Sequence, residues 1–399
     1  MDTATLVIFG LVYLGMILGE IPGLALDRTG VALLGAIAVV AVGREPLGGA
    51  WSGVDMPTIH LLFAMMVISA QFRLAGFYTH VSRRLVAADV SPERLLALVV
   101  GLTGLLSAVL TNDIVCLAMA PVLVEGCARR KLDPLPFLLA LACAANVGSA
   151  ATLIGNPQNI LIGQALRLSF AGYLFDAGVP VILGLGATWA VIAFQFRGRW
   201  QREIALPDIH APVFNRWQSF KGLAITAVLV VAFLFFPRLP REWVALVCAG
   251  VLLMSRRMAS REMMSLVDWQ LLVLFVVNHA FQQTGAMDRA LAVVRSAGVD
   301  PGRPAALFGL SVVLSNLVSN VPATMLLLPS ATHPHAGAIL ALASTLAGNL
   351  FVVGSIANII VVTSARSFGV SIDFRTHLRT GVPVTLATLA LAAIWLAVR

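Results

Sequence analysis

The chain has 399 residues, of which 59% are hydrophobic and only 12% are charged. Soluble domains carry about 25% charged residues, so a soluble fold has no core large enough to bury this much apolar surface. The formal net charge of +8 comes from basic residues in the short segments between apolar runs, and these form no basic face with interleaved aromatics. Composition therefore excludes a soluble protein and a nucleic-acid partner, and it predicts an all-α polytopic protein whose surroundings are the lipid bilayer.

The apolar segments of the first half predict five membrane crossings, since a transmembrane helix needs about 20 apolar residues. These lie near residues 3–22, 30–43, 58–76, 136–164 and 172–196. A sixth segment, Leu95–Glu125, is interrupted at residues 111–113 and has arginines beyond both ends. If both flanks are cytoplasmic, as the positive-inside rule favours, this segment is a re-entrant hairpin. A single tilted span with a kink is the alternative.

The second half of the chain repeats the first. Val31–Asp55 and Val244–Asp268 share eight of 25 residues at a constant offset of 213, among them Arg44, Ser52 and Asp55. Three further blocks recur in the same order: Ser107-x-x-x-Thr111-Asn112 with Ser315-x-x-x-Ser319-Asn320, Asn146…Gly155-x-x-x-Asn159 with Asn349…Gly354-x-x-x-Asn358, and Gly178-Val-Pro-Val181 with Gly381-Val-Pro-Val384. We therefore predict two repeats, residues 1–196 and 222–399, joined by a polar linker at 197–221.

Five crossings are an odd number, so the second repeat is expected to be inverted in the membrane. The predicted fold has two inverted repeats, with about ten transmembrane helices, two re-entrant hairpins and two broken helices. The positive-inside rule places the linker 197–221 in the cytoplasm and both chain ends outside the inner (plasma) membrane.

Polar residues interrupt the apolar segments four times, at corresponding places in the two halves. The interruptions are Thr111-Asn112-Asp113, Asn146 to Asn159, Ser319-Asn-Val-Pro322 and Gly348 to Asn358. Paired interruptions of this kind point to the binding site of a transporter. An unwound helix frees carbonyl oxygens for a cation, and the half-helix that follows offers N–H groups and a positive dipole end to an anion.

The candidate substrate ligands are the polar residues of these interruptions, which supply neutral donors and acceptors without the cost of a buried charge. They are Thr111, Asn112, Asp113, Asn146, Thr152, Asn156, Asn159, Ser319, Asn320, Asn349, Ser355 and Asn358. Asp113 is the first candidate for proton coupling, because an ionisable group deep in a membrane is usually functional. Its counterpart is Val321, and an N-cap of a helix starting at Ile114 is the alternative role. His279 is a second candidate, although a structural hydrogen bond is the commoner role for such a residue.

These motifs resemble those of the ion transporter superfamily, and most closely its arsenite-permease-like and citrate-transporter-like branches, which are related to divalent anion–sodium symporters. The resemblance covers nearly the whole chain, and the Gly155–Asn159 block is its most specific part. It implies two cation sites, one formed by Ser107, Thr111, Asn112 and the Gly155 loop, the other by Ser315, Ser319, Asn320 and the Gly354 loop. It also implies elevator-type movement and a homodimer. The symporters have Thr as the third residue of each tip motif, where this chain has Asp113 and Val321.

The sequence thus predicts a secondary active transporter of a small anion or oxyanion, coupled to a sodium or proton gradient and without a cofactor. A sodium/proton antiporter that exchanges ions at Asp113 is the alternative within transport. A membrane-embedded enzyme would need clustered acids, a metal site or a nucleophile with a base. The chain has no HExxH motif, no DDxxD-like cluster and no P-loop, and none of its four cysteines forms a CxxC pair that would indicate a metal site.

Overall fold

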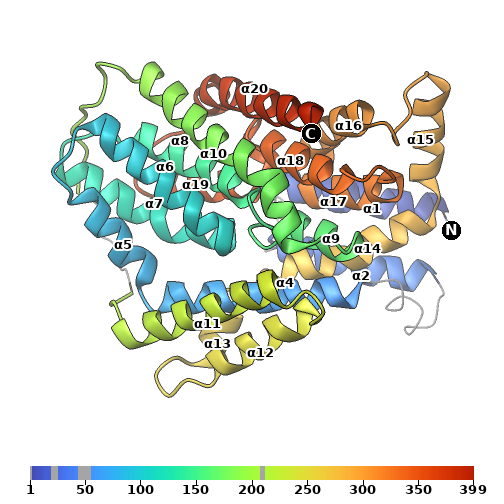
Figure 1. Ribbon diagram of the computed structural model, residues 1–399, viewed down its shortest axis with the longest axis horizontal. Coiled ribbons are helices and arrows are strands. Elements are labelled where there is room, and N and C mark those ends of the chain that lie inside the picture. The colour runs from blue at the N-terminus through green and yellow to red at the C-terminus, as the bar shows by residue number, and fades with distance from the viewer. Residues whose placement is uncertain (1, 19–25, 44–54, 207–211) are drawn as a thin grey trace.

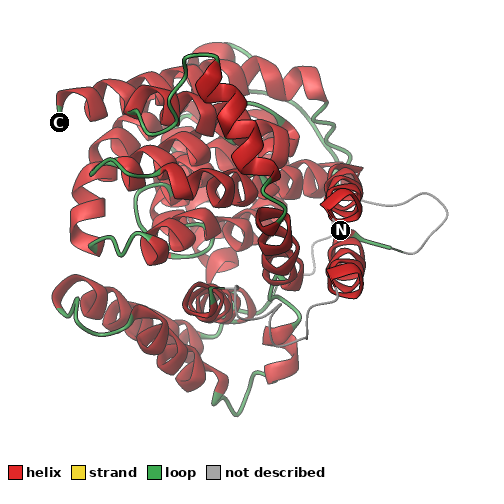
Figure 2. Cartoon of the chain, turned by 90° about the vertical axis from the view of Figure 1, so that its right-hand side faces the viewer, coloured by secondary structure: helices red, strands yellow, loops and turns green. Residues whose placement is uncertain are grey.

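The computed structural model describes residues 2–18, 26–43, 55–206 and 212–399. In this part of the chain all of the regular secondary structure is helical (Figure 2), which confirms the predicted all-α class. The first half contains α1 (Asp2–Leu18), α2 (Arg28–Gly43), α4 (Met56–Leu74), α5 (Phe77–Val86), α6 (Pro92–Val109), α7 (Asn112–Arg129), α8 (Pro134–Ser149), α9 (Pro157–Ala165) and α10 (Phe170–Gln195). The second contains α11 (Arg216–Phe235), α12 (Arg241–Leu253), α13 (Ser260–Met264), α14 (Trp269–Gln283), α15 (Ala286–Ser296), α16 (Pro304–Val318), α17 (Asn320–Leu327), α18 (Ala336–Ala347), α19 (Ile356–Ser367) and α20 (Phe374–Val398).

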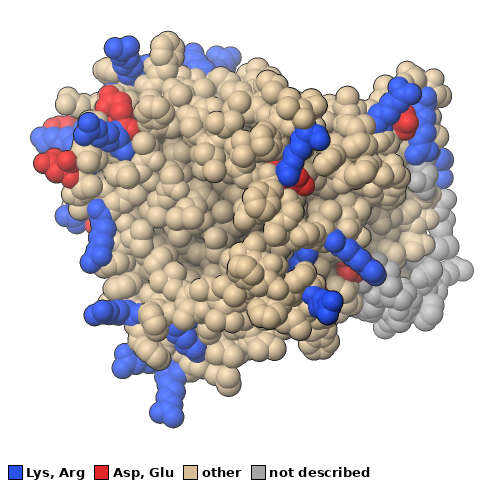
Figure 3. All heavy atoms as spheres, viewed as in Figure 1, with Lys and Arg blue, Asp and Glu red and all other residues tan. Residues whose placement is uncertain are grey.

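Five of these helices, α4, α6, α10, α11 and α20, are long and apolar enough to cross a membrane. Their outward faces carry large apolar side chains, such as Phe175 and Ile182 on α10, each 70% exposed. A contiguous apolar surface of this kind is stable only against lipid or another protein. On the face drawn in Figure 3, uncharged residues fill the centre and most Lys and Arg side chains lie nearer the edges. The helix α6 has the length of a span, so its membrane placement as a hairpin arm stays a prediction.

Corresponding helices of the two halves begin at the same types of residue. Asp55 and Asp268 are the N-cap residues of α4 and α14. Gly76 and Gly285 precede α5 and α15 with φ of +67° and +61°, a left-handed backbone that glycine adopts without strain. The predicted matches at Arg44, Ser52 and Val54 lie outside the described residues. The caps therefore fit a duplicated unit, with α4 and α5 corresponding to α14 and α15.

Packing between the halves is reciprocal. Helix α4 packs against α11 and α12 in the lower part of Figure 1, and α14 packs against α1 and α2 at its right. In the same way α7 lies against α19 while α17 lies against α9, and α10 packs on α20. Each of these contacts between the halves has a counterpart in which the two halves exchange roles. Such reciprocal contacts arise when two similar units are related by a two-fold axis. The orientation of the two units in a membrane stays a prediction.

The segment between the halves is tied to the first half at both of its described ends. The N–H of Asp133 donates to the Trp200 carbonyl at 2.8 Å, next to the isolated β-bridge between Leu132 and Gln201. Farther along, the Asn215 N–H donates to the Ala75 carbonyl at 2.9 Å. Helix α11 begins at Arg216, so residues 216–221 of the predicted linker are helical.

An ion-pair cluster fastens the base of the first hairpin to α5. Glu125 on α7 pairs with Arg83 on α5 at 3.0 Å and with Arg129 at 2.9 Å. The Arg130 guanidinium donates to the carbonyls of Val86, Ala88 and Val90, where α5 ends. The Arg130 bonds satisfy carbonyls at and just beyond the end of α5, and together with the ion pairs they hold the α7 end of the hairpin in place.

Candidate functional site

The turn between α6 and α7 is the tip of the first hairpin. The Thr111 N–H donates to Ser69 Oγ on α4 at 3.0 Å, and the Asn112 N–H donates to the Gly155 carbonyl at 3.3 Å. The tip is therefore held against α4 on one side and against the interruption between α8 and α9 on the other. Three buried side-chain oxygens of this tip have no hydrogen-bond partner among the described residues: Ser107 Oγ, Thr111 Oγ1 and Asn112 Oδ1.

The turn between α16 and α17 is the tip of the second hairpin, and it consists of Ser319 alone. Ser315 Oγ and Asn316 Oδ1 are buried there without a partner in the described part of the chain. The Asn320 amide, assigned in the orientation that satisfies both of its ends, donates to the carbonyls of Gly354 and Ser344 and accepts from Gln158. The second tip thus touches both broken helices.

Each broken helix is stabilised by one asparagine that bridges the interruption. The Asn159 amide donates to the carbonyls of Ser149 and Thr152, at 3.3 and 2.9 Å. The Asn358 amide makes the same two bonds in the second half, to the Gly348 and Phe351 carbonyls, at 2.7 and 3.1 Å. Carbonyls that the break frees are satisfied in this way, as buried backbone groups require.

Gly155 lets the backbone come close at the first interruption. A Cβ atom at this position would lie 2.3 Å from the Ser149 carbonyl oxygen and 2.6 Å from that of Ser107, both sterically forbidden. At Gly354 the corresponding atom would lie 3.1 Å from Asn316 Oδ1 and from the Gly348 carbonyl oxygen. Each glycine therefore brings an interruption within reach of the oxygens of the adjacent hairpin.

Asn146 is the centre of a buried hydrogen-bond cluster that joins the two halves. Its Nδ2 donates to Asn349 Oδ1 at 2.8 Å and to Asn358 Oδ1 at 3.1 Å. Its Oδ1 accepts from Ser355 Oγ at 2.8 Å and from Asn112 Nδ2 at 3.4 Å. The cluster therefore connects the first tip and both broken helices through one side chain.

The same cluster has a second, symmetry-related arm centred on Thr345. Asn156 Nδ2 donates to Thr345 Oγ1 at 3.2 Å, and Thr345 Oγ1 donates to Asn159 Oδ1 at 3.5 Å. The register that pairs Asn159 with Asn358 also pairs Asn146 with Thr345, since both differences are 199. The sequence blocks had instead aligned Asn146 with Asn349, which lies four residues farther along.

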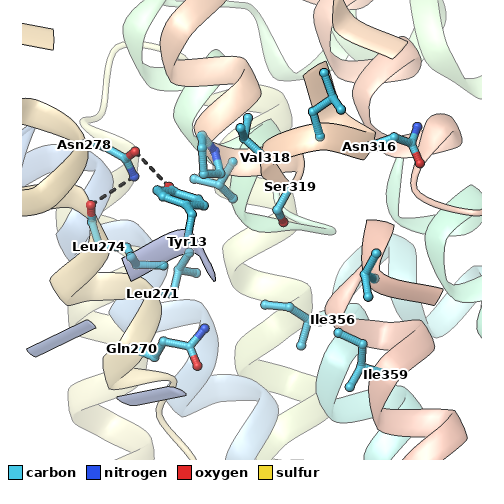
Figure 4. Close-up of a pocket in the computed structure, with 14 residues that line it drawn as sticks. Tyr13, Gln270, Leu271, Leu274, Asn278, Asn316, Val318, Ser319, Ile356 and Ile359 are labelled. Atoms are coloured by element: carbon cyan, nitrogen blue, oxygen red, sulfur yellow. Dashed lines mark hydrogen bonds between the residues drawn. The ribbon is translucent and has the colours of Figure 1, made fainter. Parts of the chain in front are cut away.

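A cavity of about 90 Å³ lies between the second tip and helices α1, α14 and α19 (Figure 4). Ser319 lines it from the tip, and Asn316 borders it with its amide turned away, toward the Val312 and Ala347 carbonyls. On the other side the Tyr13 hydroxyl donates to Asn278 Oδ1 at 2.9 Å, and Asn278 Nδ2 donates to the Leu274 carbonyl. One water needs about 10–15 Å³ on this measure, so the cavity has room for several waters or a small ion.

Four helix N-termini meet at the cluster, those of α7, α9, α17 and α19. The N-cap residues of α7, α17 and α19 make no side-chain cap hydrogen bond. Free N–H groups and aligned peptide dipoles at these ends favour an anion. The hydrogen-bonded cluster consists of uncharged Asn, Gln, Ser and Thr side chains with the Tyr173 hydroxyl, and the described residues include no group of three His, Cys, Asp or Glu that could hold a metal ion.

Comparison with known proteins identifies the family. The model of a family described as citrate transporter matches residues 6–347, which is more than half of the chain. The chain belongs to the citrate transporter family. An uncharacterized transporter of Mycobacterium bovis is 32% identical over 94% of each chain. The silicon efflux transporter of rice, Oryza sativa, is 27% identical over 96% of this chain and 95% of its own.

The crystal structure of the YdaH transporter of Alcanivorax borkumensis has the same fold, with a TM-score of 0.60 over 100% of this chain and 97% of its own, at 16% identity. Membership of the citrate transporter family and the transporter relatives establish a secondary anion transporter in a membrane, not an enzyme. They confirm the resemblance seen in the sequence.

Most of the predicted site residues come together in this citrate transporter family member. The cluster and its tips contain Asn112, Asn146, Asn156, Asn159, Asn320, Asn349, Ser355 and Asn358. Thr152 donates to the Ala108 carbonyl and so holds the interruption against the first hairpin. Ser319 lies apart from the cluster, on the wall of the cavity.

The two proton-coupling candidates lie in different surroundings. Asp113 is half-buried in the first turn of α7, directly after Asn112, and makes no hydrogen bond or ion pair with any described residue. Because α7 begins at Asn112 with Thr111 as its N-cap, Asp113 does not have the capping role considered from the sequence. His279 contacts Gln283 on its own helix at 3.1 Å and does not reach the cluster.

Sequence reasoning missed several residues that complete the site: Ser69, Gln158, Asn316, Thr345, Tyr13 and Asn278. Of these, Asn316 had the clearest signal, since it lies between Ser315 and Ser319 in a block already recognised as repeated. Thr345 is found only when the halves are aligned on Asn159 and Asn358.

Ser319→Gly is expected to stabilise this citrate transporter family protein. Ser319 has φ of +73° and ψ of 161°, a region occupied almost only by glycine, in which other residues are strained by about 1–3 kcal/mol. Glycine relieves that strain and also removes a hydroxyl group. We therefore expect a higher melting temperature in detergent for Ser319→Gly. The matched variant Ser319→Ala keeps the strain and should melt no higher than the wild type; equal melting of both variants would contradict strain at this residue.

Proposed function

We propose that this protein moves a small carboxylate or oxyanion through the site between the hairpin tips and broken helices, with sodium as the coupling ion. The observation that carries the proposal is the set of five buried oxygens without partners: Ser107 Oγ, Thr111 Oγ1, Asn112 Oδ1, Ser315 Oγ and Asn316 Oδ1. They lie at the two tips, and two of them, Ser107 Oγ and Ser315 Oγ, occupy corresponding positions in the two halves.

Unpaired oxygens of this kind favour a bound cation. A buried polar atom without a hydrogen bond destabilises the folded protein by about 1–3 kcal/mol. Five such atoms are therefore a large destabilisation unless a bound ion or water contacts them. An amide oxygen such as Asn112 Oδ1 or Asn316 Oδ1 can only accept. Freed backbone carbonyls next to such oxygens are a recurrent way for transporters to coordinate sodium. The carbonyls of Ser107 and Ser149, close to Gly155, would add to the first site.

The arrangement also supports binding of an anion that depends on the cation. No Lys or Arg side chain bonds to the described cluster, so a bound anion would rely on helix N-termini and amide N–H groups. A sodium ion at a tip adds a full positive charge close to these N-termini. Each ligand then raises the affinity of the other by the same factor, which is the requirement for symport.

Carboxylates and oxyanions are the substrate classes to test. The family is described as citrate transporter, and the rice relative is named as a silicon efflux transporter. Both substrates present several oxygens that can accept from amide and backbone N–H groups. In this proposal the tips and broken helices move together against the groups α1–α2–α14 and α4–α11–α12, in a homodimer in the plasma membrane with the linker 197–221 cytoplasmic and both chain ends outside.

Asp113 provides the specific argument for a second candidate, a sodium/proton antiporter. Its carboxyl group lies one residue beyond Asn112 and has no hydrogen bond or ion pair among the described residues. A carboxylate next to a cation site is able to exchange a proton for a sodium ion.

Uptake into proteoliposomes distinguishes the candidates. Citrate, silicate and arsenite are offered with an inward sodium gradient or a pH gradient, each imposed alone. We expect the sodium gradient to drive accumulation of one of them, and Asp113→Asn to retain this sodium-driven uptake. Accumulation driven only by the pH gradient and lost in Asp113→Asn would overturn sodium coupling. Sodium-driven proton movement without any anion would support the antiporter instead.

A further inference from the structure

Two aromatic-ring residues, Tyr173 on α10 and His377 on α20, each hold one carbonyl at the start of a helix interruption. The Tyr173 hydroxyl donates to the Ala150 carbonyl at 2.7 Å. The His377 Nε2 atom lies 3.1 Å from the Asn349 carbonyl oxygen. Both side chains are almost fully buried, at 2% and 1% exposure.

The two residues occupy corresponding positions relative to the helix caps, one residue away from the register of the Gly178-Val-Pro-Val181 and Gly381-Val-Pro-Val384 blocks. Tyr173 follows the N-cap residue Ser169 by four residues, and His377 follows the N-cap residue Asp373 by four. Both caps accept from the backbone N–H three residues later, at Gly172 and Thr376.

Their acceptors correspond as well. Ala150 and Asn349 differ by 199, which is the register of the bridging asparagines Asn159 and Asn358. The same contact therefore occurs once in each half, although the donor is a phenol in one half and an imidazole in the other.

The position of the two acceptor carbonyls explains why each needs a hydrogen-bond donor from a neighbouring helix. Ala150 and Asn349 lie just beyond the ends of α8 and α18, where carbonyls have no helical partner, and a buried carbonyl without a partner is unfavourable. Gly381 makes room for this contact in the second half. A Cβ atom at Gly381 would lie 2.4 Å from the Asn349 carbonyl oxygen and 3.2 Å from His377 Nε2.

The partner also fixes which ring nitrogen carries the proton. A carbonyl oxygen only accepts, so the His377 nitrogen that faces Asn349 is assigned as Nε2–H. Tyr173 supports the assignment, since its hydroxyl donates to the corresponding carbonyl in the first half.

Both contacts are connected to the central cluster. The Asn349 side chain accepts from Asn146, the residue that also contacts the first tip through Asn112. The Tyr173 hydroxyl accepts from Asn159, which bridges the first interruption. A change in Tyr173 is therefore transmitted to the cluster through Asn159, and a change in His377 through Asn349.

We propose that Tyr173 and His377 are paired positioning residues: each fixes the backbone at the start of one interruption and thereby sets the geometry of the binding cluster. Tyr173 bonds to Asn159 and His377 bonds to Asn349, so each acts through a residue of the cluster. The structural part of this inference stands on the contacts alone, and its consequence for transport rests on the function proposed above.

The test uses variants that keep or remove the donor. His377→Gln retains an N–H donor, whereas His377→Leu has none, and Tyr173→Phe removes only a hydroxyl. For anion uptake into proteoliposomes we expect KM to rise about tenfold in His377→Leu and Tyr173→Phe, equivalent to 1.4 kcal/mol, with a smaller change in kcat. His377→Gln should restore KM to near the wild-type value. If Gln raises KM as much as Leu does, the donor has no positioning role at His377.

A second measurement is independent of transport. Backbone hydrogen–deuterium exchange of the full chain in nanodiscs, without substrate, should become faster at residues 349–358 in His377→Leu and at 150–159 in Tyr173→Phe, and in each case not at the other interruption. Unchanged exchange in both variants overturns the proposal. If exchange changes as expected while the wild type transports no anion, the proposed function fails and the positioning role stands. Tyr173→Phe, which loses one oxygen atom only, keeps the test decisive if His377→Leu does not fold.

Discussion

Replacing Asn146 by alanine is expected to reduce anion transport to background and to lower the melting temperature. The side chain is 1% exposed and bonds to Asn349, Asn358, Ser355 and Asn112. Its removal leaves several buried polar atoms without partners, at about 1–3 kcal/mol for each atom that finds no other. It also removes the hydrogen bonds that link the first tip to the second broken helix. Uptake and thermal unfolding of the purified protein measure the two effects.

Thr345→Val is the control for this variant, because Thr345 is the symmetry counterpart of Asn146 but makes fewer bonds to the cluster. We expect a smaller loss of transport for Thr345→Val than for Asn146→Ala. Equal losses would indicate that the two arms of the cluster carry equal weight. Normal transport by Asn146→Ala would contradict the assignment of the cluster as the binding site.

Asn112→Ala and Asn320→Ala are each expected to abolish transport while leaving expression intact. Asn112 supplies an unpaired amide oxygen to the first tip and an amide N–H to Asn146. Asn320 ties the second tip to Gly354 and to Gln158. Loss of either side chain removes a ligand or misplaces a tip, and uptake measured over a range of sodium concentrations separates the two cases.

The control for loss of a buried polar group is Thr188→Ala. Thr188 is fully buried on α10, and its hydroxyl bonds to the Gly184 carbonyl of its own helix and not to either tip. It should transport like the wild type. If Asn112→Ala and Asn320→Ala also transport normally at every sodium concentration, the proposed cation sites are wrong.

The helices and the interruptions were predictable because their signals are local. The apolar segments near 58–76 and 172–196 correspond to α4 and α10, and the segment at 136–164 corresponds to α8 and α9 with the interruption between them. Pro157 and Gly155 mark that interruption directly in the sequence, since one cannot continue a helix and the other permits close backbone approach.

The contacts between the halves were not predictable in the same way. Which residue of one half meets which residue of the other depends on a register that no local pattern encodes. Alignment on shared asparagines paired Asn146 with Asn349, whereas the bridging bonds of Asn159 and Asn358 set a register that pairs Asn146 with Thr345. A threonine in an alanine-rich helix gives no sign of its own that it belongs to a site.

The two histidines illustrate the same limit. His279 was predicted as a candidate for proton coupling, yet its side chain contacts Gln283 on its own helix. His377 follows Arg375 in a polar stretch that is typical of a surface, but packing of α20 buries it against Asn349. Its counterpart Tyr173, at the same distance from a helix cap, was the one available signal.

Neither half of the chain completes its own packing, because α4 and α14 each lie against the first two helices of the opposite half. A polypeptide with only one half would have to associate with a second copy to cover the same faces. Two halves of one chain, unlike two copies of one chain, need not be identical. Asp113 opposite Val321, and His377 opposite Tyr173, are places where the halves carry different side chains, so that a symmetric scaffold carries an asymmetric set of chemical groups.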